Sequence, residues 1–134
     1  MSNTKAIGVS YLDPEFSTCY ATEEIGYATA AQGTVTQATD KSTGVTLNKS
    51  AGRITMNAAS LAANTAVSFT LTNGLISANN TIIVCISGGA TAAAYTTYIS
   101  SLATGSAVIT LRNLTGGALA EAVIVNYAII HGAS

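Results

Sequence analysis

The chain has 134 residues, enough for one domain, and its composition excludes several classes of function. Only 8% of the residues are charged, against about 25% in typical soluble domains, and the net charge is −1. Binding to nucleic acid requires clustered lysine and arginine, so that class is not expected. A membrane-spanning helix needs about 20 consecutive apolar residues, and the apolar runs here, such as 82–86, are far shorter. The basic residues are scattered: Lys5, Lys41, Lys49, Arg53 and Arg112.

Residues 1–33 are predicted to form an extended N-terminal arm. Hydrophobic periodicity is weak there, apart from one candidate strand at "KAIGVSYL" (5–12). The start, "MSNTKAIGVSYLDPEF", lacks the apolar core of a signal peptide, so export by that route is not expected. The arm also holds most of the acidic residues: Asp13, Glu15, Glu23 and Glu24. We expect it to dock on a neighbouring subunit or a larger assembly, through residues that include Tyr11, Asp13, Pro14 and Phe16.

Residues 34–134 are predicted to form one all-β domain, an antiparallel β-sandwich with a jelly-roll-like topology. Period-two alternation is clear at 67–71, where Val67, Phe69 and Leu71 face one way and the residues between them face the other. Turn signals such as "TNG", "SGGA", "ATGS" and "LTGG" separate the segments. The stretch 58–64 has the composition for one helical turn. Strands are expected at 45–48, 53–57, 67–71, 81–87, 95–101, 107–113 and 122–130.

The segment from Ile54 to Leu111 contains no Asp, Glu, Lys or Arg. Serine and threonine are expected on the outer faces of its strands, and threonine favours strands. Charges are depleted in interface cores because burying an unpaired charge is costly. We therefore expect a homo-oligomer, with a trimer favoured and a dimer as the alternative; a threonine-rich monomer with one solvated face is the other reading. The expected interface residues are Tyr95, Thr97 on an outward face, Tyr98 and Tyr127.

No catalytic arrangement, metal site or cofactor site is expected from the sequence. His131 is the only histidine, and it follows the last predicted strand, so we expect it to be solvent-exposed and not part of a triad. Cys85 lies in an apolar run and is expected to be a buried thiol, with a Cys19–Cys85 disulfide as a less favoured alternative. The paired glycines at 88–89 and 116–117 fit turns and lack the pattern of a phosphate loop. We therefore expect a protein that is not an enzyme.

Several segments carry a resemblance to a known family. They are "TKAIGVSYLDPEF", "GYATAAQGTVTQATDKSTGVTLNKSAGRITMNAASLAANTAVSFTLTN", "SGGATAAAY" and "TGGALAEAVIVNYAIIHG". Together they resemble the small virion structural proteins of tailed bacteriophages, familiar from phages of cyanobacteria, over nearly the whole chain. Members of that family are head decoration (cement) proteins or fibre proteins. Two departures, one fewer glycine in "SGGATAAAY" and His131 where lysine is common, bear on the partner and leave the expected fold unchanged.

The resemblance implies a structural component of the virion. A short chain without a long shaft favours decoration of the capsid surface, with the major capsid protein as partner and synthesis in the host cytoplasm. The alternative is a receptor-binding knob of a tail or head fibre that binds host surface polysaccharide. A phage carbohydrate hydrolase is disfavoured, because such enzymes need a pair of carboxylates about 5–10 Å apart and residues 54–111 contain none.

Overall fold

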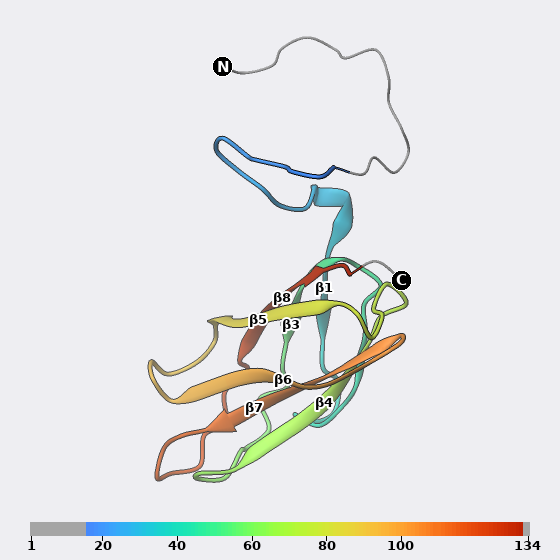
Figure 1. The fold of residues 1–134 in the computed structure, drawn as a ribbon. Coiled ribbons are helices and arrows are strands. Elements are labelled where there is room, and N and C mark those ends of the chain that lie inside the picture. Colours follow the sequence, from blue (N-terminus) through green and yellow to red (C-terminus); the bar gives the residue numbers. More distant parts are fainter. Residues whose placement is uncertain (1–15, 133–134) are drawn as a thin grey trace.

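Eight strands form two four-stranded sheets that pack face to face in a computed structural model, which describes residues 16–132 (Figure 1). The sheet order is β1-β3-β8-β5 in sheet A and β2-β4-β7-β6 in sheet B. A short 3₁₀ helix, η1 (Thr29–Ala31), precedes the first strand. The strands are β1 (Gln32–Thr36), β2 (Val45–Thr46), β3 (Ala51–Thr55), β4 (Ala66–Thr72), β5 (Thr81–Gly88), β6 (Tyr95–Ala103), β7 (Ser106–Asn113) and β8 (Ile124–Ile130). The predicted all-β sandwich is confirmed.

The core lies between the two sheets and follows from the period-two alternation of apolar residues. In β4, Phe69 and Leu71 are buried while the residues between them are exposed, as the sequence predicted. The same alternation places Ile54, Ile109, Leu111, Val125 and Ile129 in the core, each fully buried. Burying apolar surface contributes roughly 25 cal/mol per Å², so this layer is the main source of the domain's stability.

The sheets are mixed, with four antiparallel pairs and two parallel pairs that the predicted antiparallel sandwich did not include. β1 pairs with β3 in parallel, and β2 pairs with β4 in parallel. The physical reason is that the first strands alternate between sheets: the chain crosses from sheet A to sheet B and returns to sheet A in its original direction. The remaining pairs are antiparallel. The jelly-roll topology stays a prediction, because this strand order with its two parallel pairs does not establish it.

The first strand was not predicted, and it begins two residues before the expected start of the domain at residue 34. Only Val35 in β1 is a large apolar residue, and the other inward position is Gly33, so the hydrophobic signal is weak. The stretch 58–64 forms no helical turn; instead Leu61 makes an isolated antiparallel bridge with Leu119. The loop at 58–64 is thereby tied to the connection between β7 and β8.

Tyr127 and Leu47 fill the space that Gly52 leaves on the inner face of sheet A, and Leu47 and Lys49 fill that beside Gly33. Gly33 and Gly52 are direct neighbours on β1 and β3, and a Cβ at Gly52 would lie 2.6 Å from the Tyr127 ring and 2.6 Å from Leu47 Cδ2. The Tyr127 hydroxyl donates to the carbonyl of Lys49 (2.9 Å), with that of Leu47 at 3.2 Å. Buried polar groups must be hydrogen-bonded, and this hydroxyl meets that requirement through backbone oxygens.

Buried amide side chains hold the loops at the ends of the strands. Asn113 is fully buried, and its Nδ2 donates to the carbonyls of Leu61, Ala62 and Gly117 at 2.8–3.2 Å. Its Oδ1 accepts from the backbone N–H and the hydroxyl of Thr115. One side chain therefore ties the loop at 58–64 to the turn that follows β7.

Candidate interaction surfaces

The four residues predicted to form the subunit interface do not share one surface. Tyr95 and Tyr127 face the core and are 8% and 3% exposed, so neither side chain is presented to a partner. Thr97 pairs with the buried Leu111 on the inner side of β6, so its prediction as an outward residue was wrong. Tyr98 alone of the four points outward, at 47% exposure.

The outer face of sheet B carries mainly hydroxyl side chains, together with Val108 and the exposed Arg112 of β7. Tyr98, Thr110 and Ser68 form one row across β6, β7 and β4. The Thr110 hydroxyl lies 2.8 Å from that of Ser68 and donates to that of Ser100 (2.9 Å). These groups satisfy one another, so covering them costs little in lost hydrogen bonds to water. We call this surface the hydroxyl face; it comprises Ser68, Thr70, Thr72, Thr96, Tyr98, Ser100 and Thr110.

The outer face of sheet A is more apolar. Ile83 and Ile130 are about half exposed, and Cys85 is also exposed, so the prediction of a buried Cys85 thiol was wrong. Alternate residues of β5 face opposite sides although most of them are apolar. Ile82, Val84 and Ile86 face the core, whereas Cys85 pairs with Asn126 and faces outward. Cys85 and Cys19 are both free, so there is no disulfide between them. We call the surface formed by Ile83, Cys85, Ala128 and Ile130 the apolar face.

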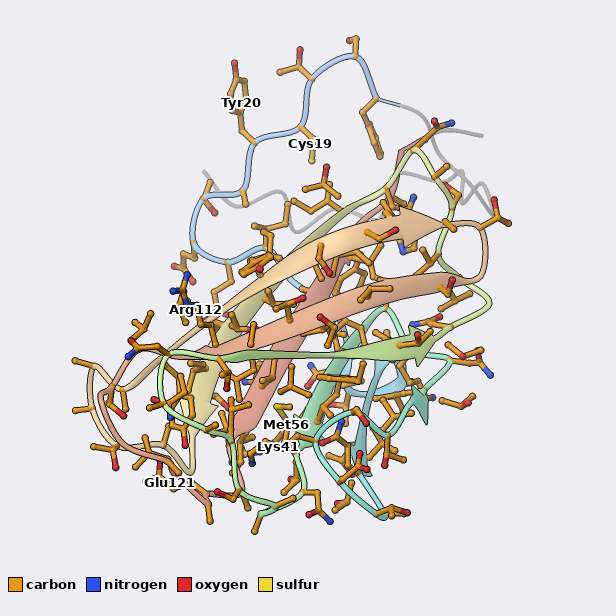
Figure 2. All side chains as sticks on the ribbon, turned by 90° about the horizontal axis from the view of Figure 1, so that it is seen from below. Cys19, Tyr20, Lys41, Met56, Arg112 and Glu121 are labelled. Carbon is orange, nitrogen blue, oxygen red and sulfur yellow. The ribbon has the colours of Figure 1, made fainter. Side chains whose placement is uncertain are left out.

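The described part of the arm, residues 16–28, leaves the sandwich beside sheet A (Figure 1). It is fixed at its base, where the Tyr27 hydroxyl donates to the Ile129 carbonyl and Gln32 Nε2 donates to the Tyr27 carbonyl (2.9 Å). Beyond that base, Figure 2 shows Cys19 and Tyr20 standing clear of the sheets. Phe16 is 69% exposed, Tyr20 90% and Ile25 88%. The other predicted docking residues, Tyr11, Asp13 and Pro14, lie outside the described residues.

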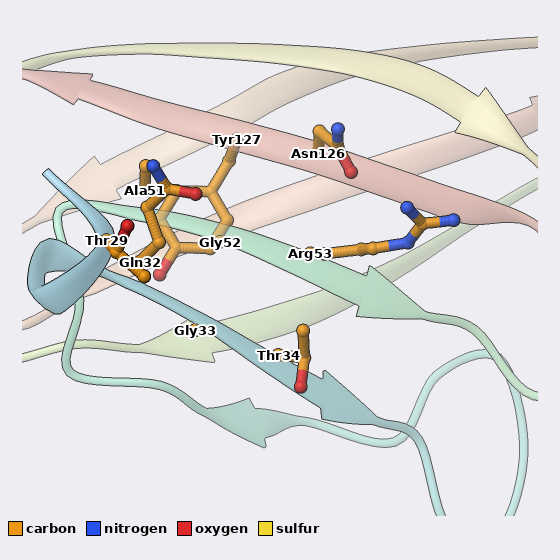
Figure 3. A pocket seen from close by; sticks show the side chains of 9 residues that line it. All are labelled: Thr29, Gln32, Gly33, Thr34, Ala51, Gly52, Arg53, Asn126 and Tyr127. Carbon is orange, nitrogen blue, oxygen red and sulfur yellow. The ribbon is translucent and has the colours of Figure 1, made fainter. Parts of the chain in front are cut away.

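Two shallow pockets lie on the sheet A side of the molecule. The first, about 440 Å³, has polar side chains at both ends and is called the polar pocket: Gln32 and Ala51 lie at one end and Thr34, Arg53 and Asn126 at the other (Figure 3). The second, about 560 Å³, is mainly apolar and lies between the base of the arm and the apolar face. Its lining includes Ile25, Tyr27, Ile83, Ala128, Ile130 and His131.

His131 is exposed at the end of β8, as predicted. Its ring meets that of Tyr27 edge-on, with centroids 6.5 Å apart, and its Nε2 lies 3.4 Å from the Ser50 hydroxyl. In residues 16–132 no carboxylate orients this imidazole, and no group of three or more His, Cys, Asp or Glu side chains is placed to hold a metal ion. Through these contacts His131 helps to hold the base of the arm against sheet A.

Two ionisable side chains, the buried Lys41 and the partly exposed Glu121, lie at the end of the sandwich away from the arm, as Figure 2 shows. Lys41 Nζ donates to the carbonyls of Asn57 and Glu121, and burial lowers the pKa of Lys41, an effect that the Glu121 charge partly offsets. Hydrogen bonds from the Thr91 hydroxyl (2.6 Å) and N–H (3.2 Å) lower the pKa of Glu121. Each charged group thus serves to hold loop backbone together.

Tyr95 lies beside this group, and its hydroxyl is buried without a hydrogen bond among the described residues. Burial, followed by the nearby Glu121 carboxylate, raises the pKa of Tyr95 to about 12. The carboxylate acts on this hydroxyl by proximity, because the two groups do not meet hydrogen-bonding geometry.

Comparison with known proteins gives no relative for this chain: no family model, no curated protein and no solved structure matches it. Among residues 16–132 there is also no helix with the length and apolar character to cross a membrane.

Proposed function

We propose that this chain is a structural protein of the bacteriophage virion that decorates the capsid shell as a non-catalytic homo-oligomer. One observation carries the proposal: the eight strands contain only two charged residues, Arg53 and Arg112. The outer faces of both sheets are therefore nearly free of charge, and covering them with another protein avoids most of the desolvation cost that lysine and glutamate impose.

The sequence resemblance to small phage virion proteins supports the same role. In this proposal the hydroxyl face packs between subunits, a trimer being favoured and a dimer the alternative. The arm, whose Phe16 and Tyr20 are exposed, makes contacts beyond its own sandwich. The major capsid protein is the proposed partner, and the protein is made in the host cytoplasm before it joins the particle.

The decisive experiment is a count of copies in purified virions by quantitative mass spectrometry. Tens to hundreds of copies per particle support capsid decoration, whereas a handful supports a fibre, and absence from the particle refutes the proposal. A companion experiment removes residues 1–26 and keeps Tyr27, which anchors the arm to Ile129. We expect the truncated protein to fold and to lose its place on the particle; an unfolded truncation would show that the arm belongs to the core.

A receptor-binding knob that binds host surface polysaccharide is the second candidate. The observation in its favour is the polar pocket, because Gln32, Arg53 and Asn126 offer neutral and charged donors that suit a ligand rich in hydroxyl groups. The test is binding of the purified protein to host cells and to isolated surface polysaccharide. Saturable binding that Asn126→Ala abolishes supports the knob, and absence of binding rules this second candidate out.

A further inference from the structure

Five of the eight large apolar side chains that are exposed among the described residues lie in one region, whereas Leu75, Tyr98 and Leu114 lie elsewhere. Three of the five, Phe16, Tyr20 and Ile25, are on the arm, and Ile83 and Ile130 are on the adjacent apolar face. Residues 16–26 make no hydrogen bond to the described residues, so no hydrogen bond within residues 16–132 fixes the side chains of Phe16, Tyr20 and Ile25. An extended segment that holds aromatic side chains in water is unfavourable unless a partner covers them.

The apolar pocket offers a receiving site for such side chains. It lies between Tyr27 and Ile83, and its largely apolar lining suits an aromatic ring. The chain's own arm forms one wall of the pocket through Ile25 and Tyr27 and then turns away, so Phe16 and Tyr20 do not line it. The donor segment and the receiving pocket are thus both present on every copy, side by side.

Charge favours the same pairing. Glu23 and Glu24 are exposed on the arm, and Arg53 is the only charged residue on the strands of sheet A. None of the three makes an ion pair within the described residues. Complementary charges of this kind fix the register of a contact more than they add to its affinity.

We propose that the arm of one copy docks on sheet A of a second copy, with Phe16 or Tyr20 in the apolar pocket and the glutamates facing Arg53. The exchange closes into a ring when each copy gives its arm to the next, which leaves no arm or pocket unoccupied. This inference rests on the proposed homo-oligomer and adds to the packing of the hydroxyl face a second contact between subunits, on sheet A.

The two native cysteines test the contact. Cys19 lies between Phe16 and Tyr20 on the arm, and Cys85 is two residues along β5 from Ile83, about 7 Å away. Docking therefore brings Cys19 of one copy near Cys85 of the next. Treatment of the purified protein with a short bis-maleimide should give covalent dimers and higher species that disappear in both Cys19→Ser and Cys85→Ser. Crosslinks that survive in either single variant, or no intermolecular crosslink, would overturn the proposal.

Charged substitutions provide a second measurement. Ile83→Glu should weaken self-association at least about tenfold in sedimentation, a loss of about 1.4 kcal/mol. Leu114→Glu is the matched control, because Leu114 is similarly exposed (48%, against 54% for Ile83) in the loop after β7. Equal effects of the two variants, or a protein that is monomeric at all concentrations, would contradict the proposal.

Charge reversal tests the register. Arg53→Glu should weaken association, and the added changes Glu23→Arg and Glu24→Arg should restore it; failure of the restoration contradicts the pairing of the arm with Arg53. All these readouts use purified protein, whereas the proposed function is decided by copies in virions. A trimer that assembles without the Cys19–Cys85 crosslink would thus refute the arm exchange and leave the proposed function standing.

Discussion

Replacement of Gly52 by alanine gives the sharpest test of how sheet A is packed. A Cβ at this position would lie 2.6 Å from the Tyr127 ring and 2.6 Å from Leu47 Cδ2, well inside van der Waals contact. The Leu47 Cδ2 atom is at the end of a flexible side chain, so it can shift. The Tyr127 ring cannot shift freely, because its hydroxyl is bonded to the carbonyl of Lys49 and the amide of Asn73.

Overpacking of this kind costs about 1–3 kcal/mol, and the gain from replacing a strand glycine offsets about 0.4–1 kcal/mol of that cost. The difference between these ranges is about 0–2.6 kcal/mol, and because the bonded Tyr127 ring limits relaxation we expect Gly52→Ala to lower the free energy of unfolding by about 1–2 kcal/mol. That loss lowers the melting temperature by about 3–10 °C for a domain of this size.

The assay is urea denaturation at one fixed protein concentration, with Gly116→Ala as the control. A Cβ at Gly116 meets nothing within 4 Å, so this control should change stability by less than about 0.5 kcal/mol. If Gly52→Ala is as stable as Gly116→Ala, the close contact between Gly52 and Tyr127 is not a real constraint, and this account of the packing fails.

The remaining predictions concern buried polar groups and the hydroxyl face. Tyr127→Phe should cost about 1–2 kcal/mol in urea denaturation because it removes bonded hydroxyl contacts, whereas Tyr95→Phe should be neutral or stabilising because its hydroxyl is unpartnered; the reverse order would refute this. Asn113→Ala should cost about 2–4 kcal/mol, against about 0.5 kcal/mol for the exposed Asn48→Ala, and similar urea midpoints would contradict the role of Asn113. Burial raises the pKa of Tyr95 and Tyr127 from 10.0 to about 12, so the stabilisation from keeping them protonated is complete below pH 10 and is lost as pH rises through 12; a urea midpoint constant from pH 9 to 12 would disprove it. Tyr98→Lys should increase the monomer fraction in light scattering if the hydroxyl face is an interface, and an unchanged mass would exclude that face.

The sequence allowed seven of the strands to be predicted because turn residues separate alternating runs. Alternation at 67–71 was unambiguous, since polar and apolar residues differ strongly there. It failed at Cys85, where the outward positions of β5 are themselves apolar and the two faces look alike. It also failed at Thr97, because threonine is tolerated on either side of an edge strand.

Local sequence patterns could not predict which strands pair with one another in the sheets. The parallel contacts of β1 with β3 and of β2 with β4 depend on which sheet each strand enters, and no feature within a strand records that choice. The core roles of Tyr95 and Tyr127 were missed for a related reason. Tyrosine suits both interfaces and interiors, and the deciding feature for Tyr127 is Gly52 on the neighbouring strand β3, which leaves room for the ring.

The position of β8 in the chain determines when sheet A can be completed during synthesis. It is the last strand of the sandwich in the chain and lies between β3 and β5, so sheet A exists as two separate pieces until residues 124–130 have been made. Strand edges without a partner promote aggregation, and this hazard lasts throughout synthesis of the earlier strands. A chain that ends before β8 would therefore expose the unpaired edges of β3 and β5 and would be prone to aggregate. Such a chain would be a target for degradation in the cell before it could assemble.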